Sequence, residues 1–439
     1  QYGQNSLGQL SAKDIAFFNY YKNGQYYDAV SLLENSQYVN ATQELINYLS
    51  TQKIGAFKAE GFKQWIDNNP NHPLISLARF NYAQQLFYAG GTQQSKIHLS
   101  KVKPYELSNS DQADYSFMTG VSLLQDENYE NAGKYFEAAR KNGFDNHSQL
   151  SYYQALTDYN LNNQEEALEG FYTIREDMNY GLSANFYRAR ILLAKEDYDG
   201  VIRLAQEELS EEKSITNAGL FQLLGEAYAK TGETSKADAY FEKAILKYPG
   251  KPSSALYYQA GVSKFKLGNV DKALAYLTES GIGSGPFATL SAFQLGRLHI
   301  KRNDLENALA AYIEASSSED IAIKEESIYQ AAMLNAKLER YTASIDYCHD
   351  YLSKYNQGKW RNEINDLLAQ SYLKTSDYDK AIKLLEKISI SNQRQKEVYQ
   401  KVTFQKSLLR FNDGLFDEAE EWFKKSLRYP VIEELTNKT

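Results

Sequence analysis

One cysteine and five histidines are the residues of this chain best suited to act as nucleophiles or metal ligands. The histidines are His72, His98, His147, His299 and His349. No two of them stand three or four residues apart, the spacing that places two ligands on one face of a helix. Cys348 and His349 are neighbours, and adjacent helical residues point about 100° apart, so they do not form a nucleophile–base pair. The single cysteine also excludes a disulfide bond within these 439 residues.

The sequence also does not support phosphate binding or catalysis by paired carboxylates. Three glycines between residues 281 and 285 resemble a phosphate loop in composition, but no strand precedes them and no lysine follows. Walker, nucleotide-binding and nucleophile-elbow motifs do not occur. Neighbouring carboxylates are more simply explained as solvated faces of helices; they occur at 165–166, 207–208 and 420–421. The sequence therefore predicts a protein that is not an enzyme and that has no cofactor and no metal site.

The composition of the chain favours a helical protein and argues against membrane-spanning and nucleic-acid-binding proteins. The chain is 43% hydrophobic and contains 7 prolines, which favours helical structure with a buried core. No apolar run of about 18 residues occurs, so we expect no transmembrane segment. The net charge of −8 argues against nucleic-acid binding, which usually requires a basic face. The sequence begins at Gln1 without a methionine, as after removal of a signal peptide. We expect a periplasmic or otherwise exported protein, with a cytoplasmic location as the alternative.

Residues 218–251 predict a helical hairpin. Apolar and small residues at i, i+3, i+4 and i+7 mark one face of a first helix; they are Phe221, Leu224, Gly225 and Tyr228. Gly232 interrupts this pattern, and Pro249 ends the hairpin. The second helix is marked by Ala237, Phe241 and Ala244. The small residues Gly225 and Ala237 leave room for the two helices to approach closely.

This hairpin resembles the tetratricopeptide repeat at all eight positions of its pattern, with Phe221 in place of tryptophan. The position of Ala237 recurs along the chain, and from Ser95 onward the intervals are 34 to 38 residues. The recurring residues are Ala29, Ala59, Ser95, Ala132, Ala167, Val201, Ala237, Ala273, Ala308, Ala343, Ala381 and Ala419. A nearly constant period of this length indicates stacked repeats. The resemblance implies an all-α fold, a right-handed superhelical solenoid of about twelve antiparallel helix-turn-helix repeats.

The repeats predict four segments. Residues 1–112 form irregular N-terminal hairpins, the first of them over 11–34, and residues 113–280 form a regular array. Residues 281–286 contain three glycines and a proline and form either a longer turn between repeats or a hinge. Residues 287–439 form a C-terminal array. Its tail begins another helical pattern, which is either a capping helix or a truncated repeat, and we favour the truncated repeat.

In this family the first helices line a concave groove that holds peptides or partner proteins. Numbering each repeat so that the seventh starts at Ala218 places the groove residues at positions five, nine and twelve. Those predicted to bind a partner are Phe117, Tyr152, Tyr159, Phe186, Arg190, Tyr258, Phe265, Phe293, Arg297 and Phe404. Their rings either pack between neighbouring first helices or form a ladder that grips an extended peptide or a glycan. The arginines either bind a partner's carboxylate or pair with a neighbouring glutamate.

The resemblance therefore predicts a non-enzymatic scaffold for a protein or peptide partner. The tyrosine near position eleven and the A-x3-F pattern of the second helix resemble repeats of envelope proteins in Gram-negative bacteria, which places the scaffold in the bacterial cell envelope. Two alternatives stay open. One is a glycan-binding component of an outer-membrane uptake system, and the other is the helical arm of a larger enzyme or sensor.

Overall fold

The computed structural model describes residues 39–53, 59–210, 218–388 and 390–439. In these ranges the regular structure is helical, and no strand occurs. The chain divides into two compact units, Gln1–Ile215 and Thr216–Thr439. The predicted first hairpin, over 11–34, lies outside the described residues.

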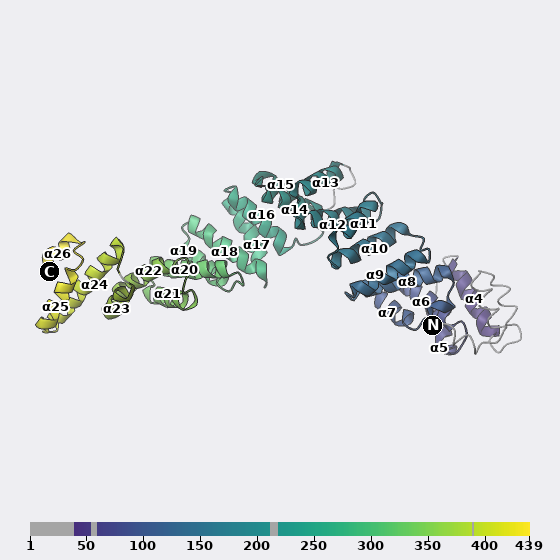
Figure 1. Ribbon diagram of the computed structural model, residues 1–439, viewed down its shortest axis with the longest axis horizontal. Helices are drawn as coiled ribbons and strands as arrows, with labels where there is room; N and C mark the ends of the chain where they lie inside the picture. The colour runs from purple at the N-terminus through teal and green to yellow at the C-terminus, as the bar shows by residue number, and fades with distance from the viewer. Residues whose placement is uncertain (1–38, 54–58, 211–217, 389) are drawn as a thin grey trace. The chain divides into compact units, whose positions relative to one another are not determined.

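In the first unit the described helices follow one another in pairs (Figure 1). They are α4 (Val39–Lys53) and α5 (Ala59–Asn68), α6 (Ile75–Tyr88) and α7 (Thr92–Leu99), α8 (Asn109–Gln125) and α9 (Tyr129–Lys141), α10 (His147–Asn160) and α11 (Gln164–Thr173), and α12 (Gly181–Ala194) and α13 (Tyr198–Ser210). A short 3-10 helix, η1 (Pro104–Glu106), separates the second pair from the third. Each pair is one predicted hairpin, from the second repeat to the sixth.

The second unit continues this arrangement with six further pairs and one short helix. They are α14 (Ala218–Lys230) and α15 (Thr234–Lys247), α16 (Ser254–Lys266) and α17 (Val270–Gly281), α18 (Pro286–Lys301) and α19 (Leu305–Ala315), α20 (Ile321–Lys337) and α21 (Tyr341–Lys354), α22 (Arg361–Lys374) and α23 (Tyr378–Ile388), α24 (Gln393–Asn412) and α25 (Phe416–Ser426), and finally α26 (Glu433–Lys438). These pairs confirm the all-helical solenoid and the order of the predicted hairpins.

In the ten hairpins from α6–α7 to α24–α25, the turn has one residue with a left-handed backbone, which lets the chain reverse within a few residues. These residues have φ between 58° and 86°. They are Gly90, Glu127, Asn162, Glu196, Gly232, Gly268, Asn303, Glu339, Ser376 and Gly414. Only four of the ten are glycines. For that reason the turn is regular in the structure although the sequence does not display it as a glycine pattern.

The register predicted for the tenth repeat is wrong by one residue. The small residue buried between the two helices is Ser344, which is 0% exposed. Ala343 is only partly buried. The hydroxyl of Ser344 donates to the carbonyl of Ala332 at 3.0 Å, as that of Ser95 donates to Ala83 at 2.7 Å in the third repeat. A serine replaces alanine here because its hydroxyl finds a backbone acceptor across the seam.

The glycine-rich segment 281–286 lies inside the second unit, between α17 and α18. Gly283 and Gly285 have φ of 102° and 133°, which favours glycine at both positions. Two serines connect the flanking helices: Ser291 donates to Ser280 at 2.8 Å, and Ser280 donates to the carbonyl of Ser254 at 2.7 Å. These two hydrogen bonds, made by residues on either side of the segment, link α16, α17 and α18. That the segment acts as a hinge stays a prediction.

Candidate partner-binding face

The first helices of neighbouring repeats contact one another in each unit. In the first unit α6 contacts α8, and α8 contacts α10. In the second unit the same contact joins α14, α16, α18, α20, α22 and α24 in succession. A row of adjacent first helices presents one common surface, which we call the first-helix face. It is built from positions five, nine and twelve of the repeats.

Three of the predicted groove residues belong to the core instead. Phe117, Phe293 and Phe404 are 0%, 8% and 6% exposed. The ring of Phe117 stacks on that of Phe144 with centroids 4.4 Å apart. The ring of Phe293 packs edge-on against Tyr312 at 5.9 Å. Neighbouring rings cover these three side chains, so their prediction as accessible groove residues is corrected.

On the first unit the structure brings three predicted residues together. The guanidinium of Arg190 on α12 lies 5.6 Å from the ring centroid of Tyr159 on α10 and 5.8 Å from that of Phe186. Arg190 is exposed, while both rings are half-buried. Among the described residues no carboxylate forms an ion pair with Arg190. The glutamate pairing considered from the sequence is therefore not found there, and the cation lies over two rings.

Tyr152 and Tyr180 extend this cluster along the first-helix face. Their ring centroids are 5.1 Å apart, and both side chains are half-buried. Burial raises the pKa of Tyr152 to about 12. Its hydroxyl is neutral at physiological pH, as in any tyrosine, and can donate a hydrogen bond. In the described part of the first unit, this surface therefore combines apolar rings, a phenol and the guanidinium of Arg190, which has no ion pair there.

The second unit has a similar mixture of rings and cations. Tyr258 on α16 packs against Phe287 on α18, with centroids 5.7 Å apart. Phe265 is half-buried, and the ammonium group of Lys301 lies 5.8 Å from its ring centroid. Arg297 is exposed and lies 5.9 Å from the ring centroid of Phe293. In the described part of the chain Arg297, like Arg190, forms no ion pair.

Sequence reasoning missed one aromatic pair because of the register error in the tenth repeat. The corrected fifth position of this repeat is Tyr329, whereas the register based on Ala343 places Ile328 there, which is 2% exposed. The half-buried ring of Tyr329 on α20 stacks on Trp360, with centroids 5.1 Å apart and planes 8° apart. The interval from Ala308 is 36 residues to Ser344 and 35 to Ala343, and both values occur elsewhere in the chain, so the spacing gave no signal for the correct register.

An amide network marks the start of the first-helix face in the second unit. The side-chain amide of Gln222 on α14 donates to Glu226 at 3.1 Å and to Gln259 on α16 at 3.0 Å. The amide of Gln259 in turn donates to Glu226 at 2.7 Å. These three side chains hold the neighbouring helices α14 and α16 together, and they leave a polar surface between the aromatic positions.

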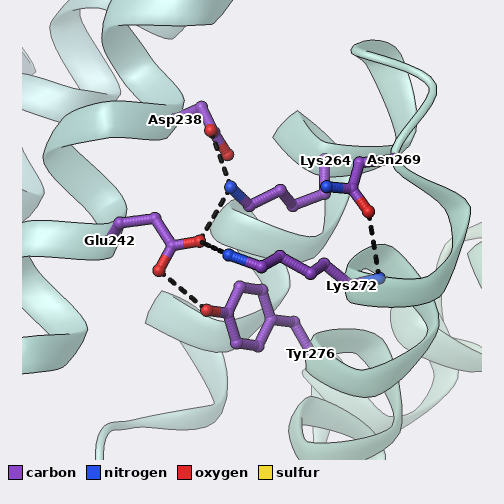
Figure 2. A network of polar contacts seen from close by, with 6 residues as sticks. All are labelled: Asp238, Glu242, Lys264, Asn269, Lys272 and Tyr276. Atoms are coloured by element: carbon purple, nitrogen blue, oxygen red, sulfur yellow. Dashed lines mark hydrogen bonds and ion pairs between the residues drawn. The ribbon is translucent and has the colours of Figure 1, made fainter.

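A second polar network joins α15 to α16 and α17 (Figure 2). Lys264 is 6% exposed and forms ion pairs with Asp238 at 2.8 Å and Glu242 at 2.7 Å. Glu242 also pairs with Lys272 at 3.1 Å and accepts from the hydroxyl of Tyr276 at 2.9 Å. Burial would lower the pKa of Lys264, but hydrogen bonds to the two carboxylates outweigh it and raise that pKa. This network connects the seventh and eighth repeats.

The single cysteine lies outside these surfaces. Cys348 is 0% exposed, and burial raises the pKa of its thiol to about 12, so the thiolate does not form at neutral pH. Within the described ranges, no three histidine, cysteine or acidic side chains gather as a metal site. The same ranges contain no helix long and apolar enough to cross a membrane.

Comparisons with known proteins identify the repeat. The tetratricopeptide repeat family matches at residues 218–246 and 258–320. A comparison with curated proteins found no match. Among solved structures, pilF of Pseudomonas aeruginosa is 15% identical, covers 47% of this chain and 91% of its own, and has a TM-score of 0.40.

Two further structures illustrate the range of similarity. The C-terminal part of a repeat-containing protein from Cytophaga hutchinsonii is 16% identical, covers 57% of this chain and 98% of its own, and has a TM-score of 0.43. The apo form of RapI is 13% identical, covers 71% of this chain and 96% of its own, and has a TM-score of 0.46. The paired helices, their regular period and the matches at 218–246 and 258–320 lead to one conclusion: this chain is a tetratricopeptide repeat protein.

Proposed function

We propose that the chain is a non-enzymatic scaffold that holds an extended segment of a partner protein on its first-helix face. The observation that carries this proposal is the cluster of Arg190, Tyr159 and Phe186, in which an exposed guanidinium without a described carboxylate partner lies over two half-buried rings. A segment of a partner protein can complete this cluster. Apolar side chains of the segment would cover the two rings, and one of its carboxylates would bind the guanidinium. On the second unit Arg297 is also exposed and without a described ion pair, but the ring beside it, that of Phe293, is buried.

The location in the bacterial cell envelope is part of the same proposal. It rests on the resemblance of the repeats to those of envelope proteins. Fractionation of the source cells, with the chain detected by antibody, tests it. Recovery in the cytosolic fraction alone would exclude this part of the proposal and leave the binding face untouched.

Cross-linking capture tests the binding face. The full chain is compared with the variant Tyr159→Ser/Arg190→Glu and with Arg203→Glu, which makes the same charge change at an exposed position on α13. Each captured protein is then purified and its affinity measured directly. We expect the first variant to weaken binding at least tenfold and the control to retain it.

Two results would contradict this proposal. Equal affinity of all three chains for every captured protein would show that the first-helix face is not the binding surface. Binding of a defined oligosaccharide by the wild type, lost in Tyr159→Ser/Arg190→Glu, would instead support the glycan-binding alternative.

A further inference from the structure

Five first helices of the second unit end in a lysine. Each lysine stands at position thirteen, five residues after the small buried residue at position eight. They are Lys230 on α14, Lys266 on α16, Lys301 on α18, Lys337 on α20 and Lys374 on α22. Because these helices contact one another in succession, the five lysines lie along one edge of the first-helix face. We call them the lysine row.

Two contacts connect neighbouring members of the row. The ammonium group of Lys301 lies 5.8 Å from the ring centroid of Phe265, the residue next to Lys266. The ammonium group of Lys374 lies 6.0 Å from the ring centroid of Tyr341, four residues after Lys337. In both cases a lysine extends onto the repeat that contains the preceding lysine.

All five lysines are exposed, and in the described ranges none of them forms an ion pair. Carboxylates in three of the adjoining turns, each three residues after a lysine of the row, have other partners. Glu233 pairs with Lys236, and Asp377 pairs with Lys380 at 3.0 Å. Asp304 caps the N-terminus of α19. The ammonium groups of the row are therefore available to an anion from outside the chain.

Stabilisation of helix ends does not by itself explain the row. A lysine in the last turn stabilises a helix in any repeat. In the first unit, however, α8, α10 and α12 end at the same position with Gln125, Asn160 and Ala194, and none of these helices has a basic residue in its last turn. The cations are thus concentrated on successive first helices of the second unit, although the chain has a net charge of −8.

Apolar residues accompany the lysines. The residue before each lysine, at position twelve, is apolar and partly buried in all five repeats. These residues are Ala229, Phe265, Ile300, Ala336 and Leu373. Cations beside apolar side chains suit a protein segment that carries carboxylates on one side and apolar residues on another. A single-stranded nucleic acid would require aromatic rings for its bases, and only one of these five residues is aromatic.

The spacing of the helices sets the spacing of the carboxylates in such a segment. The axes of packed helices lie about 8–10 Å apart, so successive lysines begin about that far from one another. A polyproline II segment rises about 3.1 Å per residue and completes a turn in three residues. Residues i and i+3 of that segment therefore lie on one side, about 9 Å apart, which matches successive lysines.

We propose that the lysine row binds an extended acidic segment of a partner protein, with a carboxylate at every third residue and apolar residues between. This inference rests on the proposed binding of a partner to the first-helix face, and it adds the charge and the spacing recognised by the second unit. Arg297 is exposed and stands one helical turn before Lys301, so it supplies a further cation beside the row. The Arg190 cluster belongs to the first unit, and each site can be changed without the other.

A repeating peptide tests the proposal on the full chain. The probe is a fluorescent peptide of five Glu-Leu-Pro repeats, and a comparison peptide carries glutamine in place of glutamate. A third peptide has the composition of the probe with its five glutamates consecutive. Fluorescence anisotropy measures the affinity of each peptide for wild type and for the row variant Lys266→Gln/Lys301→Gln/Lys337→Gln, and circular dichroism verifies that the variant retains its helices.

The matched control removes three exposed lysines from the second helices α15 and α23: Lys247→Gln/Lys383→Gln/Lys387→Gln. We expect the glutamate repeat to bind wild type and this control equally and the row variant at least tenfold more weakly. The consecutive glutamates should bind wild type more weakly than the repeat does, and the glutamine peptide should not bind.

Equal affinity of wild type and the row variant for the glutamate repeat, or no binding to either, would overturn the proposal. So would binding of anionic phospholipid vesicles or of a single-stranded oligonucleotide that is tighter than that of the peptide and is lost in the row variant, because the row would then serve another polyanion. Tyr159→Ser/Arg190→Glu should bind the glutamate repeat as wild type does. A failure of this test therefore leaves the proposed function of the Arg190 cluster to its own experiment.

Discussion

The ring of Phe241 on α15 lies directly against Gly225 on α14: a Cβ atom at Gly225 would stand 2.7 Å from Cδ1 and Cε1 of that ring. The same contact recurs in other hairpins between a glycine of the first helix and a large residue of the second helix. In each case the large residue follows the glycine by sixteen positions. The contact joins Gly120 to Phe136, Gly261 to Leu277 and Gly296 to Tyr312, with closest distances between 2.6 and 2.8 Å. This contact fixes how closely the two helices of a hairpin approach.

Gly225→Ala should therefore destabilise its hairpin. The added methyl group displaces the ring of Phe241, and such overpacking costs about 1–3 kcal/mol. The double variant Gly225→Ala/Phe241→Leu should regain most of this loss because the smaller side chain makes room. Gly133→Ala on α9 is the control: its nearest neighbour would be 3.8 Å away, and replacing a helical glycine should stabilise the protein by about 0.5–1 kcal/mol. Denaturant unfolding of all four chains measures these differences, and equal stability of Gly225→Ala and wild type would contradict the seam contact.

Glu127→Gly should stabilise the fourth repeat. Glu127 is exposed and has φ of 60°, a left-handed backbone that costs a residue with a side chain about 1–2 kcal/mol. Glycine removes this strain but loses more entropy on folding, so we expect a net gain of about 0.5–1 kcal/mol. The reverse change, Gly232→Glu at φ of 84°, should cost a similar amount. Melting temperatures that move in the same direction for both variants would show that backbone strain is not the cause.

Lys264→Met should weaken the junction of the seventh and eighth repeats. It leaves the carboxylates of Asp238 and Glu242 without their buried cation (Figure 2), which we expect to cost about 2–4 kcal/mol after allowance for the partial exposure of Glu242. The more exposed Lys272, changed to methionine, should cost less than about 1 kcal/mol. Hydrogen exchange of the amides in α15 to α17 reports the local effect. Protection that falls equally in both variants would contradict the greater importance of Lys264.

Asp114 should make stability depend on pH. Burial, reinforced by Asp111 and Asp145, raises its pKa from 3.8 to about 6, although an amide hydrogen bond from Gln84 opposes the shift. Between these pH values the folded protein retains a proton that the unfolded chain has released, so the free energy of unfolding falls as pH rises through this window. Asp114→Asn keeps the acceptor but cannot ionise. It should exceed wild type in stability by about 1–2 kcal/mol at pH 7.5, after allowance for the partial exposure of the carboxyl group, and match it near pH 4.

Urea unfolding of wild type and Asp114→Asn at both pH values checks this difference. Asp145→Asn serves as the comparison, because it removes only one of the surrounding charges and should give a smaller gain. A stability difference between wild type and Asp114→Asn that does not change with pH would show that Asp114 ionises normally in the folded protein.

Local patterns in the sequence determined the hairpins. Helical spacing around residues such as Gly225 and Tyr228, and a nearly constant period, were sufficient to predict paired helices because each repeat folds mainly through contacts with itself and its neighbours. The burial of Ala237 and Phe241, 0% and 1% exposed, follows from the same pattern. The close contact of Gly225 with Phe241 confirms the predicted seam between the two helices.

Only the tertiary structure decided which aromatic residues are accessible. Phe117 and Tyr258 both stand at position five, yet Phe117 is fully buried by Phe144 and neighbouring rings, whereas Tyr258 remains half-buried. The difference comes from residues of other helices and turns, which a pattern within one repeat does not contain. The exposure of Leu409 and Leu415 was not predicted for the same reason. The accessibility of a side chain depends on residues of other repeats that pack against it, whereas the pattern within one repeat specifies only the contacts inside that repeat.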